Sequence, residues 1–288
     1  MIARGGPSCT RGFLEAVRRS GHTRADVFGT RQGARMDVQA YLKRIGLEQA
    51  PSPDREGMRA LHEKHLLSVP FENLAIHAGE PTPLEDRALF EKVVARHRGG
   101  FCYELNGAFR WLLRAIGVDC HFVSAEVSKG NGEYTPPFDH MAILIPGDVP
   151  LVADVGFGDS FRYPLWLVPD RVQDEEGRSY RFVRQGEHWL LQQRILSGEW
   201  SDQFRFTIEP VEYAAFDGMW SFHYDSPASH FRKAPLATLA TPDGRITLSG
   251  SKFIETKLDG MRTEQPVDSD QAFDTVLVDR FGISSWRA

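Results

Sequence analysis

Apolar and polar positions repeat with a helical period in the first part of the chain. Between residues 36 and 117, apolar side chains recur every three or four positions, which is typical of amphipathic helices. Asp37 and Asp54 stand where helix N-caps are expected, and Gly46 and Pro70 stand where helices end. The pattern predicts helices over residues 37–46, 54–70, 84–94 and 102–117.

The period changes to two after residue 119, which indicates strands with one buried face. Strands are predicted over residues 120–127, 141–145, 151–155, 179–184, 189–192, 204–208, 236–241, 244–249 and 252–257. A last helix is expected over residues 268–281. The order is helices, then antiparallel strands, then a C-terminal part that has both strands and a helix. This order indicates an α+β protein rather than a doubly wound sheet.

The first 35 residues differ from the rest of the chain in charge. They hold seven arginines but only two acidic residues, and arginine-rich, acid-poor N-termini are typical of transit peptides. An extension upstream of an internal start at Met36 explains the same composition, and we favour that interpretation.

Composition excludes several classes of function. A net charge of −5 over 288 residues speaks against a nucleic-acid partner, and the apolar runs are too short to cross a membrane. Three cysteines without paired spacing do not suggest a disulfide framework, and they fit a reducing compartment such as the cytoplasm.

Cys102 is the first candidate for chemistry. It follows the pair Gly99-Gly100 and begins the helix predicted over residues 102–117. Unpaired N–H groups at a helix N-terminus favour a thiolate, so we expect a lowered pKa for Cys102. Glycines at this point allow a tight turn and the close approach of another molecule. A buried structural cysteine is the alternative, because free cysteines are often core residues.

A nucleophilic cysteine needs a base, and the base needs a group that orients it. If two of the predicted strands form a hairpin with Ile145 opposite Leu151, Asp154 is the diagonal neighbour of His140 on one face of the sheet. Asp154 then holds one tautomer of the imidazole, whereas a one-residue slip would separate the two. Alternatively, Asp154 is a buried carboxylate bonded to backbone amides.

Other histidines are weaker candidates. His62 and His65 are placed on a solvated or inter-helix face, because no acidic or cysteine partner completes a metal site there. His97 is expected at the surface, and His230 lies in a turn-like segment that could bind a ligand.

Four motifs together resemble the arylamine N-acetyltransferase family. They are Arg98-Gly99-Gly100-Phe101-Cys102-Tyr103-Glu104-Leu105-Asn106, Asp139-His140-Met141, Asp154-Val155-Gly156-Phe157-Gly158 and Val69-Pro70-Phe71-Glu72-Asn73-Leu74. Each is weak alone, but their order and spacing agree with the family. The resemblance extends from Met36 to near the C-terminus and leaves out residues 1–35, which supports Met36 as the functional start.

The resemblance implies an architecture. After an extension (residues 1–35), it implies an N-terminal helical bundle (36–118), a central antiparallel β-barrel-like domain (119–225) and a C-terminal α/β lid (226–288). Together these make an α+β fold with a papain-like arrangement of the triad Cys102, His140 and Asp154.

The resemblance also implies an activity. An acetyl group passes in a ping-pong reaction from acetyl-CoA, the co-substrate, through an acetyl-cysteine on Cys102 to arylamines, hydrazines or N-hydroxyarylamines. No metal, nucleic acid or membrane takes part, and a homodimer is compatible with this chemistry.

Residues that meet the substrates follow from the same resemblance. Phe71, Val127, Phe157 and Phe138 are expected to form an apolar pocket for the acceptor, which suits a flat aromatic amine. Without the resemblance, Phe71 and Phe157 would be taken as core residues. The residues expected beside CoA are Pro136, Pro137 and Asp139, with Lys129, Arg232 or Lys233 at its phosphates.

Three other functions stay open at this point. A papain-like cysteine hydrolase would use the same triad to cleave peptides and would form no stable acetyl-cysteine. An amide synthase would close a macrolactam from a carrier-bound acyl chain in a wider cleft. A non-catalytic CoA-binding or scaffold protein is disfavoured, because it has no need of Cys102, His140 and Asp154 together.

Overall fold

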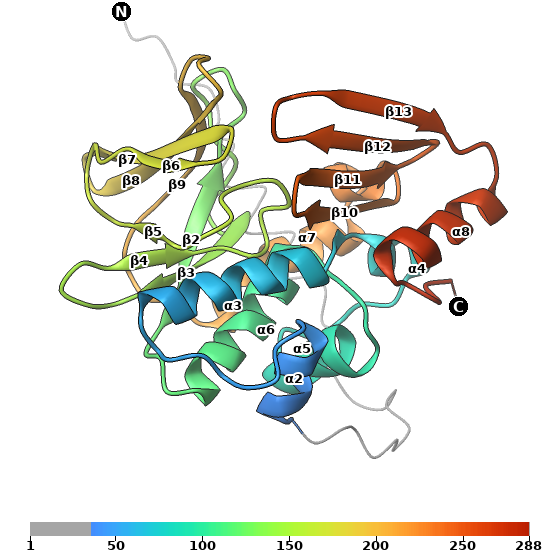
Figure 1. Ribbon diagram of the computed structural model, residues 1–288, viewed down its shortest axis with the longest axis horizontal. Coiled ribbons are helices and arrows are strands. Elements are labelled where there is room, and N and C mark those ends of the chain that lie inside the picture. The colour runs from blue at the N-terminus through green and yellow to red at the C-terminus, as the bar shows by residue number, and fades with distance from the viewer. Residues whose placement is uncertain (1–35, 288) are drawn as a thin grey trace, which may run out of the picture. The chain divides into compact units, whose positions relative to one another are not determined.

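The computed structural model describes residues 36–287, and most of its helices come early in that range (Figure 1). These helices and helical turns are α2 (Val38–Arg44), α3 (Arg55–Ser68), α4 (Leu74–Ala78), α5 (Asp86–Phe90), η1 (Glu91–Ala95) and α6 (Cys102–Ala115). The predicted N-caps are confirmed, because the carboxylates of Asp37 and Asp54 accept hydrogen bonds from backbone N–H groups. The helix predicted over residues 84–94 is instead α5 followed by one π-helical turn, η1.

Eight antiparallel strands form a curved, nearly closed sheet, here called the barrel-like sheet (Figure 1). Its spatial order is β5-β4-β3-β2-β9-β8-β7-β6. Its strands are β2 (His121–Val127), β3 (His140–Ile145), β4 (Leu151–Ala153), β5 (Leu165–Trp166), β6 (Gln173–Glu175), β7 (Arg178–Gln185), β8 (His188–Ile195) and β9 (Ser201–Phe206). Ile145 lies opposite Leu151, so the expected hairpin register is confirmed.

A second antiparallel sheet has five strands in the order β1-β10-β11-β12-β13. They are β1 (Phe71–Glu72), β10 (Leu236–Thr241), β11 (Gly244–Ser249), β12 (Lys252–Lys257) and β13 (Arg262–Pro266). Helix α8 (Asp270–Phe281) packs on this sheet through a cluster that includes Leu248, Phe273 and Leu277. The segment between the sheets holds η2 (Tyr213–Phe216), α7 (Asp217–Asp225) and η3 (His230–Arg232).

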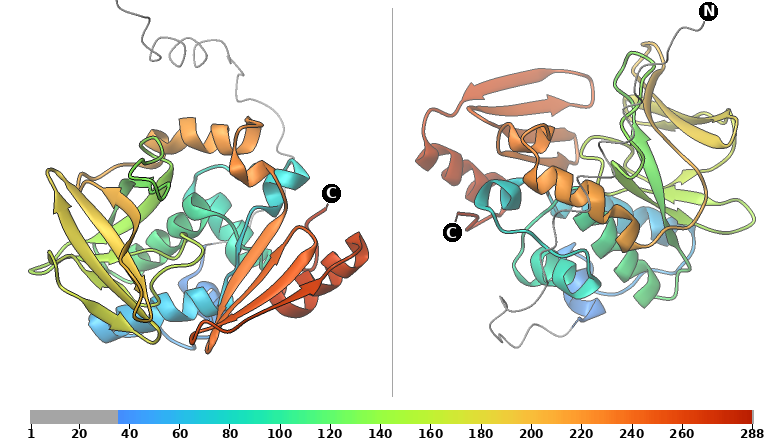
Figure 2. Two further views of the ribbon diagram at one scale, coloured as in Figure 1. Left: turned by 90° about the horizontal axis from the view of Figure 1, so that it is seen from above. Right: turned by 180° about the vertical axis from the view of Figure 1, so that it is seen from behind.

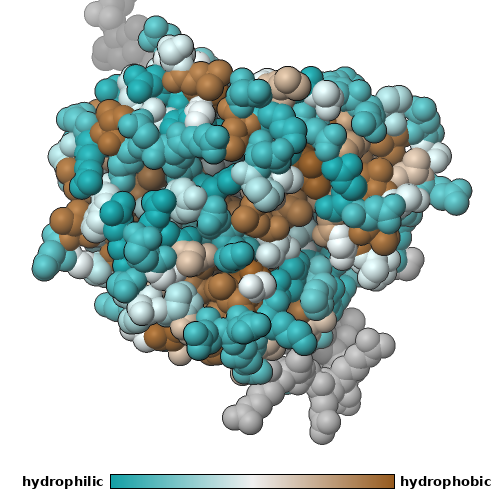
Figure 3. Space-filling view, in the orientation of Figure 1, coloured by the Kyte–Doolittle hydropathy of each residue, from teal (hydrophilic) through white to brown (hydrophobic). Residues whose placement is uncertain are grey.

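Helix α6 places the candidate cysteine between the two sheets. Figure 2 shows α6 in the space between the barrel-like sheet and the five-stranded sheet. Eleven of its residues are buried, and Leu105, Phe109 and Leu112 are part of the helical core. On the face drawn in Figure 3, apolar side chains form separate patches among polar ones. The expected α+β class with a barrel-like sheet is therefore confirmed, and a doubly wound sheet is not present in the described residues.

Candidate active site

The glycine pair before Cys102 is required by the chain's own backbone. A Cβ atom on Gly99 would lie 2.0 Å from the carbonyl oxygen of Pro70, and one on Gly100 would lie 2.5 Å from the Glu104 carboxylate. The N–H of Glu72 in β1 also donates to the carbonyl of Gly100 at 2.9 Å. We expected another molecule to approach these glycines; the space beside Gly99 is instead taken by Pro70.

Two buried ion pairs hold the start of α6. Arg98 Nη2 lies 2.8 Å from Glu72 Oε1, and Lys92 Nζ lies 2.7 Å from Glu104 Oε1. All four side chains are at most 4% exposed. Glu104 also accepts a hydrogen bond from the N–H of Phe101, the residue before the helix. Removing one member of such a pair leaves an unpaired buried charge, so this arrangement fixes where α6 begins.

His140 and Asp154 form the close pair that the hairpin register predicts. His140 Nε2 donates to Asp154 Oδ2 at 2.7 Å, and both side chains are at most 3% exposed. The other carboxylate oxygen of Asp154 accepts from Asn106 Nδ2 and from the N–H of Gly156. With Nε2 bonded to Asp154, the neutral imidazole of His140 has its lone pair on Nδ1, so that nitrogen can accept a proton.

Asn106 ties this pair to helix α6. Its Nδ2 donates to the carbonyl of Met141 and to Asp154, while its Oδ1 accepts from the N–H of Val155. One amide therefore contacts strand β3 and the segment directly after β4 from the second turn of the helix. Asn106 belongs to the motif around Cys102, but the sequence assigned it no role.

His62 supports Asp154 from helix α3, where the sequence placed it on a solvated or inter-helix face. Its Nδ1 donates to the carbonyl of Arg162 at 2.8 Å, and its Nε2 accepts from the N–H of Asp154 at 3.0 Å. A carbonyl only accepts and an N–H only donates, so these contacts define one neutral tautomer. Burial lowers the pKa of His62 to about 4. His65 is fully buried too, whereas His97 is exposed as expected.

The thiol of Cys102 differs from its expected state. Burial first, and then the carboxylates of Asp139 and Asp154, raise the pKa of Cys102 well above its usual value. The N–H groups of Met141 and Tyr103 bond to the sulfur and act in the opposite direction. The predicted lowering of the pKa by the helix N-terminus is therefore wrong for the site as it stands. A thiolate here needs a neighbouring positive charge.

Cys102 and His140 line a common cavity of about 590 Å³. Phe71, Val127 and Phe157 stand on its wall, where the sequence placed them. Phe157 also packs edge-on against the His140 ring, with 5.1 Å between ring centroids. The cavity thus combines a thiol and an imidazole with apolar walls of aromatic size.

The other predicted contacts divide into two groups. Asp139, His230 and Lys233 line the cavity. Five other residues expected at the substrates are not among the described residues that line the cavity, namely Pro136, Pro137, Phe138, Lys129 and Arg232. Phe138, expected in the acceptor pocket, has a positive φ of 68° and packs against Phe216 instead.

Two of the expected phosphate contacts are engaged elsewhere. Lys129 lies 3.9 Å from Glu133 across an exposed turn. Arg232 donates to the carbonyl of Tyr224. Of the three basic residues considered for the CoA phosphates, Lys233 alone faces the cavity.

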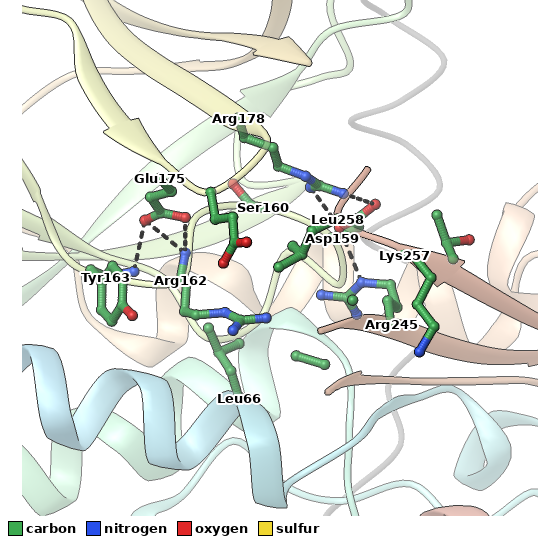
Figure 4. A pocket seen from close by; sticks show the side chains of 14 residues that line it. Leu66, Asp159, Ser160, Arg162, Tyr163, Glu175, Arg178, Arg245, Lys257 and Leu258 are labelled. Carbon is green, nitrogen blue, oxygen red and sulfur yellow. Dashed lines mark hydrogen bonds and ion pairs between the residues drawn. The ribbon is translucent and has the colours of Figure 1, made fainter. Parts of the chain in front are cut away.

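A second, smaller cavity of about 100 Å³ lies where the two sheets meet (Figure 4). Arg178 from β7 and Arg245 from β11 both donate to the carboxylate of Asp159, and Glu175 accepts from the N–H groups of Arg162 and Tyr163. Asp159 and the two arginines thus form ion pairs across the boundary between the sheets, and Glu175 is bonded by backbone N–H groups. We therefore interpret this cavity as a structural junction and the larger one as the candidate site.

Comparison with known proteins assigns the chain and its fold to a family. A family model described as N-acetyltransferase matches residues 54–286. The chain is 32% identical over 249 residues to the arylamine N-acetyltransferase of Escherichia coli (strain K12), covering 84% of this chain and 87% of that protein. It is 33% identical over 256 residues to the arylamine N-acetyltransferase of Mycolicibacterium smegmatis, covering 86% and 92%. The chain belongs to the arylamine N-acetyltransferase family.

Solved structures of the family agree with this assignment. The arylamine N-acetyltransferase of Mycobacterium marinum in complex with CoA superposes with a TM-score of 0.78 at 29% identity, covering 86% of this chain and 93% of that chain. The resemblance inferred from the four motifs is confirmed, and the chain is an acetyltransferase. Among residues 36–287, no helix has the length and apolar character needed to span a membrane.

Proposed function

We propose that this acetyltransferase moves an acetyl group from acetyl-CoA to arylamines, hydrazines or N-hydroxyarylamines through an acetyl-cysteine on Cys102. One observation carries the proposal: the thiol of Cys102 and the imidazole of His140, which is bonded to Asp154, line one apolar-walled cavity. The CoA complex of the Mycobacterium marinum relative supports CoA as the carrier of the acetyl group. Lys233 is the basic residue we assign to the CoA phosphates, because it faces the cavity.

The first half of the reaction charges the enzyme. His140 takes the proton of the Cys102 thiol, and Asp154 stabilises the resulting imidazolium. The imidazolium in turn offsets the burial that raises the pKa of Cys102. The thiolate attacks the acetyl carbon, the bond between that carbon and the CoA sulfur breaks, and the CoA thiolate takes the proton from His140.

The second half transfers the acetyl group. The neutral nitrogen of the acceptor attacks the acetyl-cysteine, His140 takes a proton from that nitrogen, and the bond between the acetyl carbon and Cys102 breaks. The Cys102 sulfur then takes that proton from His140, which restores the starting state of both residues. As the first residue of α6, Cys102 has a backbone N–H without an intrahelical acceptor, and we assign that N–H to the oxyanion in both halves.

Intact-mass spectrometry after mixing with acetyl-CoA tests the proposal. We expect one acetyl group on the wild type, none on Cys102→Ala, and one on the control Cys120→Ala. Cys120 is a suitable control because it is also a free, buried cysteine, but it does not line the cavity. The adduct should disappear when an arylamine such as aniline is added, with acetanilide as the product.

Other outcomes would identify the alternatives. Turnover of peptide substrates without a stable adduct would overturn the transferase and support a cysteine hydrolase. Poor reaction with acetyl-CoA but rapid acylation of Cys102 by a long carrier-bound acyl chain would support an amide synthase. No adduct with any short acyl-CoA would refute the proposed donor.

A further inference from the structure

Asp139 brings a second carboxylate into the candidate site, and the reaction described above does not use it. It directly precedes His140, and it lines the same cavity while being 9% exposed. Its backbone carbonyl lies 3.9 Å from Cys102 Sγ and accepts a hydrogen bond from the Tyr103 hydroxyl at 3.1 Å. Asp139 therefore belongs to the wall beside the reacting sulfur, close enough for its carboxylate to raise the pKa of the Cys102 thiol.

The carboxylate of Asp139 is held in place by groups that favour its charged form. His223 Nε2 lies 3.3 Å from Asp139 Oδ1, and the Thr135 side chain bonds to the same carboxylate. The hydroxyl of Ser229 accepts from the N–H of Phe231 and lies 3.1 Å from His223 Nδ1, so it can donate its proton there. That chain of contacts leaves the proton of His223 on Nε2, facing Asp139.

Few other charges face this part of the cavity. His140, His223 and His230 are the imidazoles near Asp139, and burial lowers the pKa of His230. The contacts of the Asp139 carboxylate with His223 and Thr135 lower its pKa despite its burial. Lys233 is exposed at the rim, where water screens its charge. The remaining wall is largely apolar, so the negative charge of Asp139 acts in a poorly solvated space.

We propose that Asp139 makes the acceptor pocket selective for charge, favouring acceptors whose second substituent is cationic and disfavouring those with an anionic substituent. This inference rests on the proposed function, because it concerns the second half of that reaction. The reacting nitrogen must be neutral to attack the thioester, so the selected charge belongs to another group of the acceptor. An arylamine with an alkylammonium substituent meets both conditions near neutral pH.

Three acceptors of similar shape test the proposal. They are 4-(2-aminoethyl)aniline, 4-ethylaniline and 4-aminophenylacetate, in which methylene groups separate the charge from the reacting nitrogen. The acetyl-enzyme is first confirmed by mass, and its loss is then timed for each acceptor. Failure to form the acetyl-enzyme would count against the proposed function, whereas the order of the three rates reports on the charge preference of the pocket, and its change in Asp139 variants assigns that preference to Asp139.

The readout is the ratio of kcat/KM for the cationic acceptor to kcat/KM for the anionic one. Each ratio comes from one preparation, so the fraction of folded protein cancels. We expect Asp139→Asn to lower the ratio by about tenfold or more, the size of effect that a unit charge several ångströms away has at an effective dielectric constant near 20. Asp139→Glu keeps the charge and should keep the ratio.

The control is Asp148→Asn, which makes the same chemical change on the exposed turn after β3. It should leave the ratio unchanged. A wild-type enzyme that prefers 4-aminophenylacetate would overturn the proposal without any variant. Equal ratios for the wild type and Asp139→Asn would overturn it as well.

Discussion

Replacing His62 with glutamine should flatten the response of stability to acid. The folded protein holds His62 neutral, because burial lowers its pKa to about 4 and both ring nitrogens are engaged. The unfolded chain binds a proton on the same residue at its ordinary pKa of about 6.5. As the pH falls below that value, the unfolded state binds a proton at His62 and the folded state does not. The free energy of unfolding therefore decreases.

The size of this effect follows from the two pKa values. The full difference between about 6.5 and about 4 corresponds to roughly 3.4 kcal/mol, reached below pH 4. At pH 5 the folded protein has lost about 2 kcal/mol relative to pH 8 through His62 alone. His62→Gln keeps a side-chain acceptor near the N–H of Asp154 but does not titrate, so about 2 kcal/mol of the pH dependence should disappear.

Urea unfolding at pH 8 and pH 5 measures this difference for the wild type and for His62→Gln. Comparing each protein with itself removes the constant cost of leaving the Arg162 carbonyl without its donor, about 1–3 kcal/mol. His97→Gln is the matched control, because His97 is exposed and its replacement should change the pH dependence little. An equal loss of stability between pH 8 and pH 5 in the wild type and in His62→Gln would refute the reasoning.

Three further substitutions probe the site and its support. Asp154→Asn should lower turnover by about 10³-fold or more while circular dichroism stays native, because the amide cannot stabilise an imidazolium; near-normal turnover would remove Asp154 from the triad. Gly156→Ala places a Cβ 2.8 Å from the Cys102 backbone, so we expect lost turnover and about 1–3 kcal/mol of destabilisation. Gly147→Ala, whose nearest contact is 3.8 Å, should have neither effect. Glu72→Gln leaves the Arg98 charge buried and should cost about 3–5 kcal/mol in thermal or urea unfolding. Glu264→Gln at the surface should cost far less, and equal costs would contradict the importance of burial.

The sequence predicted those parts of the site that depend on local geometry. A short turn joins β3, which begins at His140, to β4, which ends directly before Asp154. One register assumption therefore placed the two side chains together, and the structure has that register. The helix start at Cys102 followed in the same way from the glycine pair and the helical period. In each case, residues close in sequence determine the contact.

Contacts between distant segments were not predictable from spacing. His62 reaches the backbone of Asp154 from α3, and nothing in the helical pattern of α3 indicates that partner. Strand β13 escaped prediction because all five of its residues are exposed and show no alternation. The pKa of Cys102 depends on burial and on Asp139, which a helix N-terminus considered alone does not include.

The short strand β1 has a consequence for the order in which the protein is made. Phe71, a wall of the cavity, pairs with Thr238 in β10, and its ring lies 6.0 Å from that of Phe231. During synthesis, a growing chain has Cys102, His140 and Asp154 well before it has β10. A ribosome-bound chain that stops short of residue 236 would therefore carry the reactive groups in a cleft without the wall that β10 supports. The enclosed pocket can form only when the last part of the chain emerges.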